Sequence, residues 1–191
     1  MSEKMSEKNK EEEKAPSEDL KPPEPRAIGI FSDINEKKSE DIVYALKLYT
    51  ADSKEDIDFY ISTSGGSAAD MFAIYDFMRE TREKLDIVTH GLGKVMSAGI
   101  LLLAAGTKGK RKVGKHCRVM IHTVVGANAG PFHELENEMC EIQHIQNMYI
   151  QALCLETKLT KKKIRALFAK NVNVYLSAEE AVEYGIADII V

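Results

Sequence analysis

Short apolar runs rich in β-branched residues recur along the chain from residue 27 onward. Such side chains pack well on a pleated surface, so each run predicts a strand. Between the runs lie amphipathic segments, and this alternation is typical of an α/β domain built around one sheet. The five predicted strands are AIGIF at 27–31, IDFYI at 57–61, LDIVT at 85–89, RVMI at 118–121 and ADIIV at 187–191.

The amphipathic segments predict helices, because their apolar residues recur every three or four positions. The clearest cover residues 39–49, 67–78 and 131–156. The third is longer than one small domain needs to cover its core, so we expect it to project or to contact a partner. Near the C-terminus, Ser177 and Glu180 have the spacing of a capping box that begins a last helix, and Gly185 ends it.

The first 26 residues have a different character. They contain MSEKMSEK, EEEK and KPPEP and almost no apolar side chains. Such a segment buries too little surface to offset the entropy of ordering, so residues 1–26 are predicted to be a disordered charged tail, either a solvating extension or a docking segment. The remaining residues, 27–191, are predicted to form one domain, which we expect to fold without the tail.

Composition narrows the classes of function. The chain has 191 residues and a net charge of -4, and its basic residues are interspersed with acidic ones, so we expect no nucleic-acid partner. The longest apolar stretch, 95–106, is shorter than the roughly 20 residues of a membrane span, so we expect no membrane association. Three cysteines without zinc-site spacing, and no secretory signal, favour reduced thiols and a cytoplasmic location.

The segment STSGGS at 62–67 follows a predicted strand and precedes a predicted helix. Glycines there let backbone amides approach a ligand closely, and an exposed N–H at a helix start can stabilise an oxyanion. Gly66 is best placed for this role. The alternative is a plain strand-to-helix turn.

A second candidate is the segment GKVMSAG at 93–99, which enters an apolar helix. Small neighbours would expose the Ser97 hydroxyl, and the amide of Ala98 could be a second oxyanion donor. The alternative for Ser97 is an N-cap, the role that we also assign to the hydroxyls of Ser64 and Ser67. His122 follows the strand at 118–121, and its imidazole is a natural base for a serine, although an isolated histidine there can also be structural.

Two other groups of residues could in principle bind a ligand. Cys140 and His144 lie four residues apart on the long helix, but a metal site needs further ligands, so no metal site is expected. The basic run at 108–115 is short and has no aromatic companions. It is interpreted as a solvated turn rather than a phosphate site.

Taken together, four strings resemble the proteolytic subunits of Clp protease, the ClpP family, over nearly all of residues 27–191. The strings are STSGGSAADMFAIYDFM, GKVMSAGILLLAAGTKGKR, RVMIH and LSAEEAVEYGIADIIV. The resemblance implies a ClpP/crotonase-like fold of repeated strand-strand-helix units with a projecting handle helix.

The resemblance also implies a serine endopeptidase that needs no cofactor. Two stacked heptameric rings, a tetradecamer, would cut unfolded polypeptides delivered by an ATP-driven Clp unfoldase. Ser97 would be the nucleophile and His122 the base, with Gly66 and Ala98 as oxyanion donors. The helix from residue 131 would pair the rings, and a strand within 127–132 would lie beside the substrate.

The chain departs from the family pattern at several positions. The third catalytic position, an aspartate in the family, falls on Asn173, which predicts weak rather than absent activity. Ser64 replaces a proline that stiffens the oxyanion loop. The family's axial loop is replaced by the charged tail. Positions of the apolar unfoldase-docking groove that have become charged, beside a retained Tyr60, are Asp58, Glu80 and Lys112.

Two alternatives to an active peptidase remain at this point. The first is a structural ring subunit with little or no activity, which Asn173 and the altered docking positions favour. The second is a crotonase-type acyl-CoA enzyme, which would share the fold and the paired oxyanion amides. The chain shows no feature assignable to coenzyme A binding.

Overall fold

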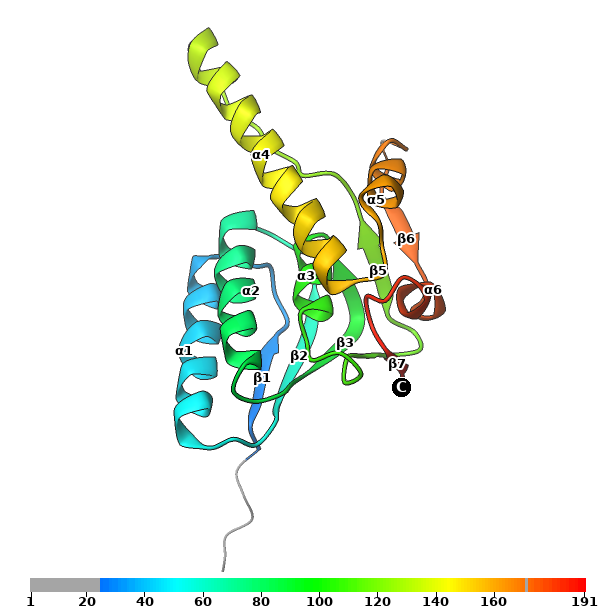
Figure 1. The fold of residues 1–191 in the computed structure, drawn as a ribbon. Helices are drawn as coiled ribbons and strands as arrows, with labels where there is room; N and C mark the ends of the chain where they lie inside the picture. Colours follow the sequence, from blue (N-terminus) through cyan, green and yellow to red (C-terminus); the bar gives the residue numbers. More distant parts are fainter. Residues whose placement is uncertain (1–24, 171) are drawn as a thin grey trace, which may run out of the picture.

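The computed structural model describes residues 25–170 and 172–191 (Figure 1). Strands and helices alternate through most of this length, as the apolar pattern predicts. In chain order the elements are β1 (Ala27–Ile30), α1 (Glu36–Asp52), β2 (Ile57–Thr63), α2 (Ala68–Arg82), β3 (Ile87–Met96), α3 (Ala98–Ala104), β4 (Lys112–Val113), β5 (Arg118–Ile121), α4 (Phe132–Glu156), α5 (Lys161–Phe168), β6 (Val174–Leu176), α6 (Ala178–Glu183) and β7 (Ile189–Ile190).

One sheet organises the molecule, with the strand order β1-β2-β3-β4-β7 and parallel neighbours. Strand β3 is long enough to pair with two successive strands. It pairs with β4 at His90 and Gly91, and its last three residues pair with β5. Strand β6 adds to β5 in antiparallel orientation. The end of β3 therefore lies between β2 and β5, directly before Ser97.

All five predicted strands are confirmed, but the sheet has seven strands. The additional strands, β4 and β6, have only two and three residues. Strands of that length cannot show a period-2 pattern. Helix α5 was also missed, although Thr160 caps it and Ile164, Leu167 and Phe168 give it a buried face. The Ser177–Glu180 capping box and the end of α6 at Gly185, whose φ is +72°, are confirmed.

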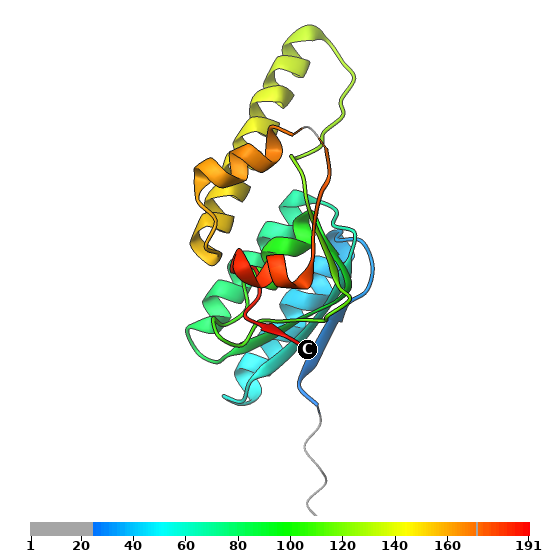
Figure 2. The same cartoon turned by 90° about the vertical axis from the view of Figure 1, so that its right-hand side faces the viewer.

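Strand β2 shows how the core is built. Its residues alternate strictly, so that Ile57, Phe59 and Ile61 are fully buried while Tyr60 lies on the opposite, partly exposed face. Helices pack over the buried face: α3 against β2 and β3, and α1 against β1 and α2. Figure 2 shows the helices on one side of the strands. Within the described residues, none of the helices has the length and hydropathy that crossing a membrane requires.

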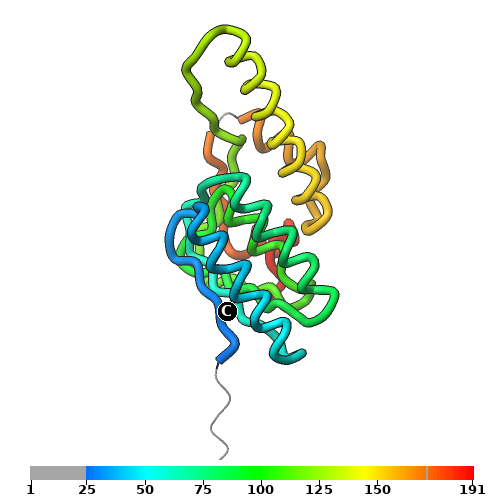
Figure 3. Tube along the Cα trace, turned by 90° about the vertical axis from the view of Figure 1, so that its left-hand side faces the viewer, coloured from blue at the N-terminus to red at the C-terminus, as the bar shows by residue number. Residues whose placement is uncertain are grey.

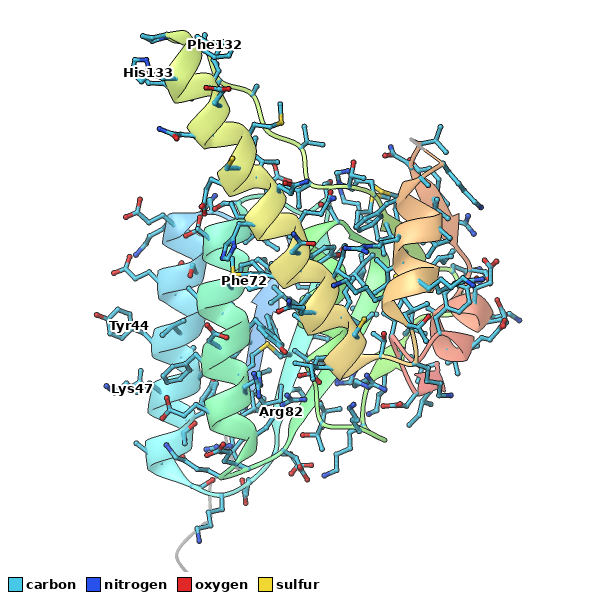
Figure 4. The ribbon with its side chains drawn as sticks, turned by 45° about the horizontal axis from the view of Figure 1, so that its top comes forward. Tyr44, Lys47, Phe72, Arg82, Phe132 and His133 are labelled. Carbon is cyan, nitrogen blue, oxygen red and sulfur yellow. The ribbon has the colours of Figure 1, made fainter. Side chains whose placement is uncertain are left out.

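Helix α4 projects beyond the body, as the fold class predicts (Figure 1). Its first 17 residues include no buried side chain, and Tyr149 is the first buried residue reached from its free end. Phe132 and His133 lie at that free end (Figure 4), where Phe132 is 75% exposed. Figure 3 shows the segment between β5 and α4 running beside the helix.

The expected strand within residues 127–132 is wrong for the described chain. Residues 122–130 belong to no strand, and Pro131 is the N-cap of α4. A strand needs a neighbouring strand to accept its hydrogen bonds, and within residues 25–170 and 172–191 no strand pairs there. Instead the segment packs on α4, since a Cβ at Gly126 would lie 2.3 Å from Ile142.

The basic run at 108–115 is also not simply a solvated turn. Arg111 is only 3% exposed, and its guanidinium donates to both carboxylate oxygens of Asp188 at 2.6–2.8 Å. It donates further to the carbonyls of Ala104 and Glu156. Because those groups come from α3, α4 and the C-terminal segment, Arg111 ties three distant parts of the chain together.

The predicted boundary of the N-terminal tail needs a small correction. Arg26 was placed in the tail, yet its carbonyl accepts the amide proton of Asp58, which extends the β1–β2 pairing. Its guanidinium donates to Asp52 at 3.0 Å and to the carbonyl of Tyr49 at 2.7 Å. Arg26 therefore belongs to the folded domain. The rest of the tail prediction, residues 1–24, lies outside the described residues.

Candidate active site

The backbone at Ser97 turns sharply between β3 and α3. Ser97 has φ 54° and ψ -122°, and it is the one non-glycine residue with positive φ in residues 25–170 and 172–191. A serine in this region is strained and persists only where its surroundings hold it. Its amide donates to the carbonyl of Met120 in β5 at 2.8 Å. The turn therefore presents the side chain of Ser97 beside the end of β5.

The Ser97 hydroxyl is not used as a helix cap. Ser97 occupies the N-cap position of α3, but its side chain makes no capping hydrogen bond. Instead Oγ lies 2.8 Å from Nε2 of His122, the residue that follows β5. When Nδ1 carries the ring proton, the hydroxyl donates to Nε2, which is the arrangement that a general base requires. By contrast, Ser67 does cap α2, because its Oγ accepts the amide proton of Asp70 at 3.3 Å.

The loop before α2 packs directly against this serine. Gly65 and Gly66 have φ values of 106° and 146°, which side chains rarely adopt. A Cβ at Gly65 would lie 2.7 Å from the Cβ of Ser97, and one at Gly66 would lie 2.1 Å from the carbonyl oxygen of Ile34. Glycine at residue 65 therefore allows the loop to approach Ser97, and glycine at residue 66 allows it to approach Ile34.

A cavity of about 430 Å³ opens over these groups. Gly66 and Ala98 both line it, as do Ser97 and His122. Within the described residues, neither amide of the glycine–alanine pair donates to a backbone carbonyl. Two such N–H groups beside a hydroxyl can stabilise negative charge on a carbonyl oxygen. The remaining wall is mixed in polarity and includes Ser64, Ser67, Ala68, Met71, Thr123, Val124, Val125 and Tyr149.

Burial sets the protonation of the histidine. Desolvation lowers the pKa of His122 below its ordinary value of 6.5. The imidazole is therefore mostly neutral at pH 7 and can accept a proton from the hydroxyl. Within residues 25–170 and 172–191, no carboxylate bonds to the ring to raise that pKa.

Asn173 is placed near His122 by the backbone but not by its side chain. The antiparallel register pairs Ile121 with Val174, and one further step sets His122 opposite Asn173. The Asn173 side chain is exposed, and no hydrogen bond joins it to the imidazole in the described part of the chain. The structure thus brings together Ser97, His122, Gly66 and Ala98, whereas Asn173 stays at the edge.

Two polar contacts near the site were not anticipated. Ser64, expected to be a cap, instead accepts a hydrogen bond from Nζ of Lys94 at 2.7 Å. This bond tethers the glycine loop to β3 where the family has a stiffening proline. Tyr149 lies within the helix predicted over 131–156, and its hydroxyl donates to the carbonyl of Ser97 at 2.9 Å. The sequence signal for Tyr149 is weak, because a tyrosine also fits an apolar stripe.

The metal alternative gains no support from the structure. Cys140 and His144 are exposed on α4. Among the residues that the structure describes, no group of three or more histidine, cysteine or acidic side chains is placed to hold an ion. A two-ligand pair on one helix does not complete a tetrahedral site.

Comparison with known proteins agrees with this geometry. Residues 20–191 match the Clp protease family. The chain is 34% identical over 164 residues to ATP-dependent Clp protease proteolytic subunit 1 of Leifsonia xyli subsp. xyli, covering 85% of this chain and 81% of that protein. It is 36% identical over 167 residues to subunit 1 of Corynebacterium glutamicum (86% and 78%). It is also 36% identical over 172 residues to subunit 2 of Mycobacterium leprae (86% and 77%).

The family match favours the peptidase over an acyl-CoA enzyme. It spans the glycine loop, the Ser97 turn, β5 and the C-terminal capping box. With 34–36% identity over most of each relative's length, the chain belongs to the Clp protease family and is a ClpP-like serine-type peptidase.

Proposed function

We propose that Ser97 is the nucleophile of this peptidase and His122 its general base. The observation that carries the proposal is the 2.8 Å contact between Ser97 Oγ and His122 Nε2, two residues that line the same cavity. The strained backbone of Ser97 supports it, because strain of this kind clusters at reactive residues. The resemblance of the surrounding segments to ClpP adds to that support.

In the proposed reaction, Ser97 Oγ attacks the substrate's peptide carbonyl while its proton passes to His122 Nε2. The carbonyl oxygen, now negative, accepts hydrogen bonds from the amides of Gly66 and Ala98. His122 then protonates the leaving amine, and water hydrolyses the acyl-enzyme with the same histidine as base. Each step uses groups that line one cavity, and no cofactor is needed.

A fluorophosphonate probe tests this assignment, since it labels only an activated serine. We expect labelling of the full chain and none of Ser97→Ala, with labelling of His122→Ala strongly reduced. Ser67→Ala is the matched control, because Ser67 lines the same cavity but caps α2. Labelling that persists in Ser97→Ala would assign the nucleophile to another residue.

We further propose that the chain forms heptameric rings and that α4 pairs two such rings into a tetradecamer. The projecting half of α4 carries exposed apolar side chains, with Phe132 at 75%, Met139 at 69% and Leu135 at 38%. Such a surface favours burial against another subunit. Light scattering on the full chain should give a ring-sized particle, and Phe132→Ser with Met139→Ser should reduce it. A monomer at micromolar concentration would contradict the proposal.

The proposed substrates are unfolded polypeptides, cut inside the ring in the cytoplasm, with an ATP-driven Clp unfoldase as a partner. The relatives' names describe ATP-dependent proteases. The residues at the positions where the family docks its unfoldase are polar in this chain. His90 Nε2 lies 2.6 Å from Asp58, and the His90 ring stacks on Tyr60. Comparing casein degradation with and without an unfoldase would test this part.

An inactive structural subunit is the second candidate. The observation that supports it is Asn173, which is uncharged and exposed and makes no hydrogen bond to His122. The intact Ser97–His122 contact favours the active peptidase. The labelling experiment separates the two, because a purely structural subunit would not react.

A further inference from the structure

We propose that Tyr149 is a positioning residue for the nucleophile, and that through it the geometry of Ser97 depends on how α4 is seated. The inference rests on the proposed role of Ser97. Tyr149 Oη donates to the Ser97 carbonyl at 2.9 Å across 52 positions of sequence. No other side chain among the described residues bonds to that carbonyl.

The bond completes a clamp on a strained residue. On one side the Ser97 amide donates to the Met120 carbonyl in β5. On the other side the Ser97 carbonyl accepts from Tyr149 and, at 3.1 Å, from the amide of Ile100 in α3. The Ile100 bond belongs to the first turn of a seven-residue helix, so only Tyr149 connects the carbonyl to a separate, long element. A positive φ is kept only when several contacts agree on it.

The position of the carbonyl matters for chemistry because it is part of the peptide group that joins Ser97 to Ala98. The amide of Ala98 is the second proposed oxyanion donor. Rotation of this peptide group would redirect the Ala98 N–H together with the Ser97 carbonyl. The Tyr149 hydroxyl therefore acts on the proposed donor through a single planar unit.

The Tyr149 hydroxyl remains protonated and can donate its hydrogen bond at all times. Tyr149 is 5% exposed, and burial raises its pKa far above its ordinary value of 10.0, so it remains a donor at every working pH. A buried hydroxyl without a partner is costly, and the Ser97 carbonyl is the partner it has. A phenyl ring would fill the same space without this bond.

Tyr149 also marks where α4 enters the body. Toward the free end of α4 no residue is buried, and from Tyr149 onward the helix packs on α3 and α5. A tilt or shift of the projecting half on contact with another subunit would therefore be transmitted to Tyr149, the first buried residue of α4. This links assembly to the reactivity of Ser97 through a short physical route.

The test is Tyr149→Phe in the full chain, with Tyr75→Phe as matched control. Tyr75 is likewise buried, but its hydroxyl donates to Glu156 rather than to the active site. We expect Tyr149→Phe to lower kcat and the rate of fluorophosphonate labelling about tenfold, the size of effect that one buried hydrogen bond supplies. KM, particle mass and the acid limb of the pH profile should stay unchanged. Tyr75→Phe should lower the melting temperature and leave labelling unchanged.

Several outcomes are informative. Equal labelling of Tyr149→Phe and the unchanged chain would overturn the inference while leaving the proposed function intact. A labelling rate that falls only in Tyr149→Met, and not in Tyr149→Phe, would show that the ring's volume matters rather than its hydroxyl, and would also overturn it. If the unchanged chain fails to label at Ser97, both this inference and the proposed function are wrong.

Discussion

The buried half of α4 is held by a different polar cluster at each end. At one end Tyr149 meets the carbonyl of Ser97, beside His122. At the other end Glu156 is bound by Arg82 at 2.8 and 3.0 Å and by the hydroxyl of Tyr75 at 3.1 Å. Each cluster uses a buried tyrosine as donor, but only the second contains an ion pair, between the buried Glu156 and the partly buried Arg82.

The two clusters differ in how completely their polar groups are satisfied. Both carboxylate oxygens of Glu156 have donors, and its backbone carbonyl accepts from Arg111. In the Ser97 cluster, Gly66 and Ala98 line a cavity, and within the described residues their amides donate to no backbone carbonyl. Satisfied buried groups stabilise a fold, whereas donors held ready and unpaired are suited to bind a developing charge. We therefore expect changes at the first cluster to affect activity and changes at the second to affect stability.

The largest effect should come from Ser97→Ala. Loss of the nucleophile should lower kcat on a fluorogenic peptide by about 10⁴-fold or more. The melting temperature should be nearly unchanged, because the Ser97 hydroxyl caps no helix and contacts His122 beside a cavity. A loss of stability comparable to that of a core mutation would contradict the expectation that the Ser97 cluster affects activity rather than stability. Activity within tenfold of the unchanged chain would contradict the assignment of Ser97.

The second effect concerns the charged cluster. Arg82→Met leaves the carboxylate of Glu156 buried without its main partner, and this should lower the free energy of unfolding by about 3 kcal/mol. Urea unfolding at fixed protein concentration measures it. The control is Lys84→Met, which removes an exposed ion pair with Glu80 and should cost less than about 0.5 kcal/mol. Equal effects of the two changes would show that the buried pair is not a major anchor.

The third prediction concerns a negative charge added beside the Ser97 cluster. Asn173→Asp should raise kcat at pH 8 about tenfold, because a carboxylate opposite His122 stabilises the imidazolium formed during attack. Burial lowers the pKa of His122, so activity in the unchanged chain should fall only below pH 6.5, as the imidazole becomes charged. A new negative charge raises that pKa, and the acid limb should therefore move to higher pH, by about one unit.

A pH–rate profile of kcat/KM for both proteins checks this shift. Asn173→Gln is the control, since it keeps the amide and adds no charge. An unchanged acid limb in Asn173→Asp would mean that residue 173 does not reach the imidazole even when charged.

The smallest effect is expected at the tether of the glycine loop. Lys94→Met removes the hydrogen bond to Ser64 at an exposed position, so peptide hydrolysis should fall two- to threefold, about the value of one solvated hydrogen bond. Ser64→Pro in the same variant should recover part of the loss by stiffening the loop. Lys47→Met, on the outer face of α1 (Figure 4), should change nothing. A similar loss in the Lys47 variant would indicate a general charge effect.

Much of the candidate site could be predicted from short segments. The glycines before α2, the serine before an apolar helix and the histidine after β5 each carry a local signature, and their order along the chain is specific. The roles of Arg111, Ser64 and Tyr149 could not be predicted in this way. Arg111 lies 77 positions from Asp188, and Lys94 lies 30 from Ser64, so neither partner is visible in a local window.

The sequence by itself determined the longer strands and helices and their order, the caps of α2 and α6 and the projecting α4, because period, capping and turn chemistry depend on residues a few positions apart. Only the tertiary structure decided which polar groups meet. The pairing of β3 with β5 brings His122 to Ser97, and the packing of α4 on α3 brings Tyr149 to the same residue. These contacts depend on strand register and helix packing, which the whole core sets, so no single segment encodes them.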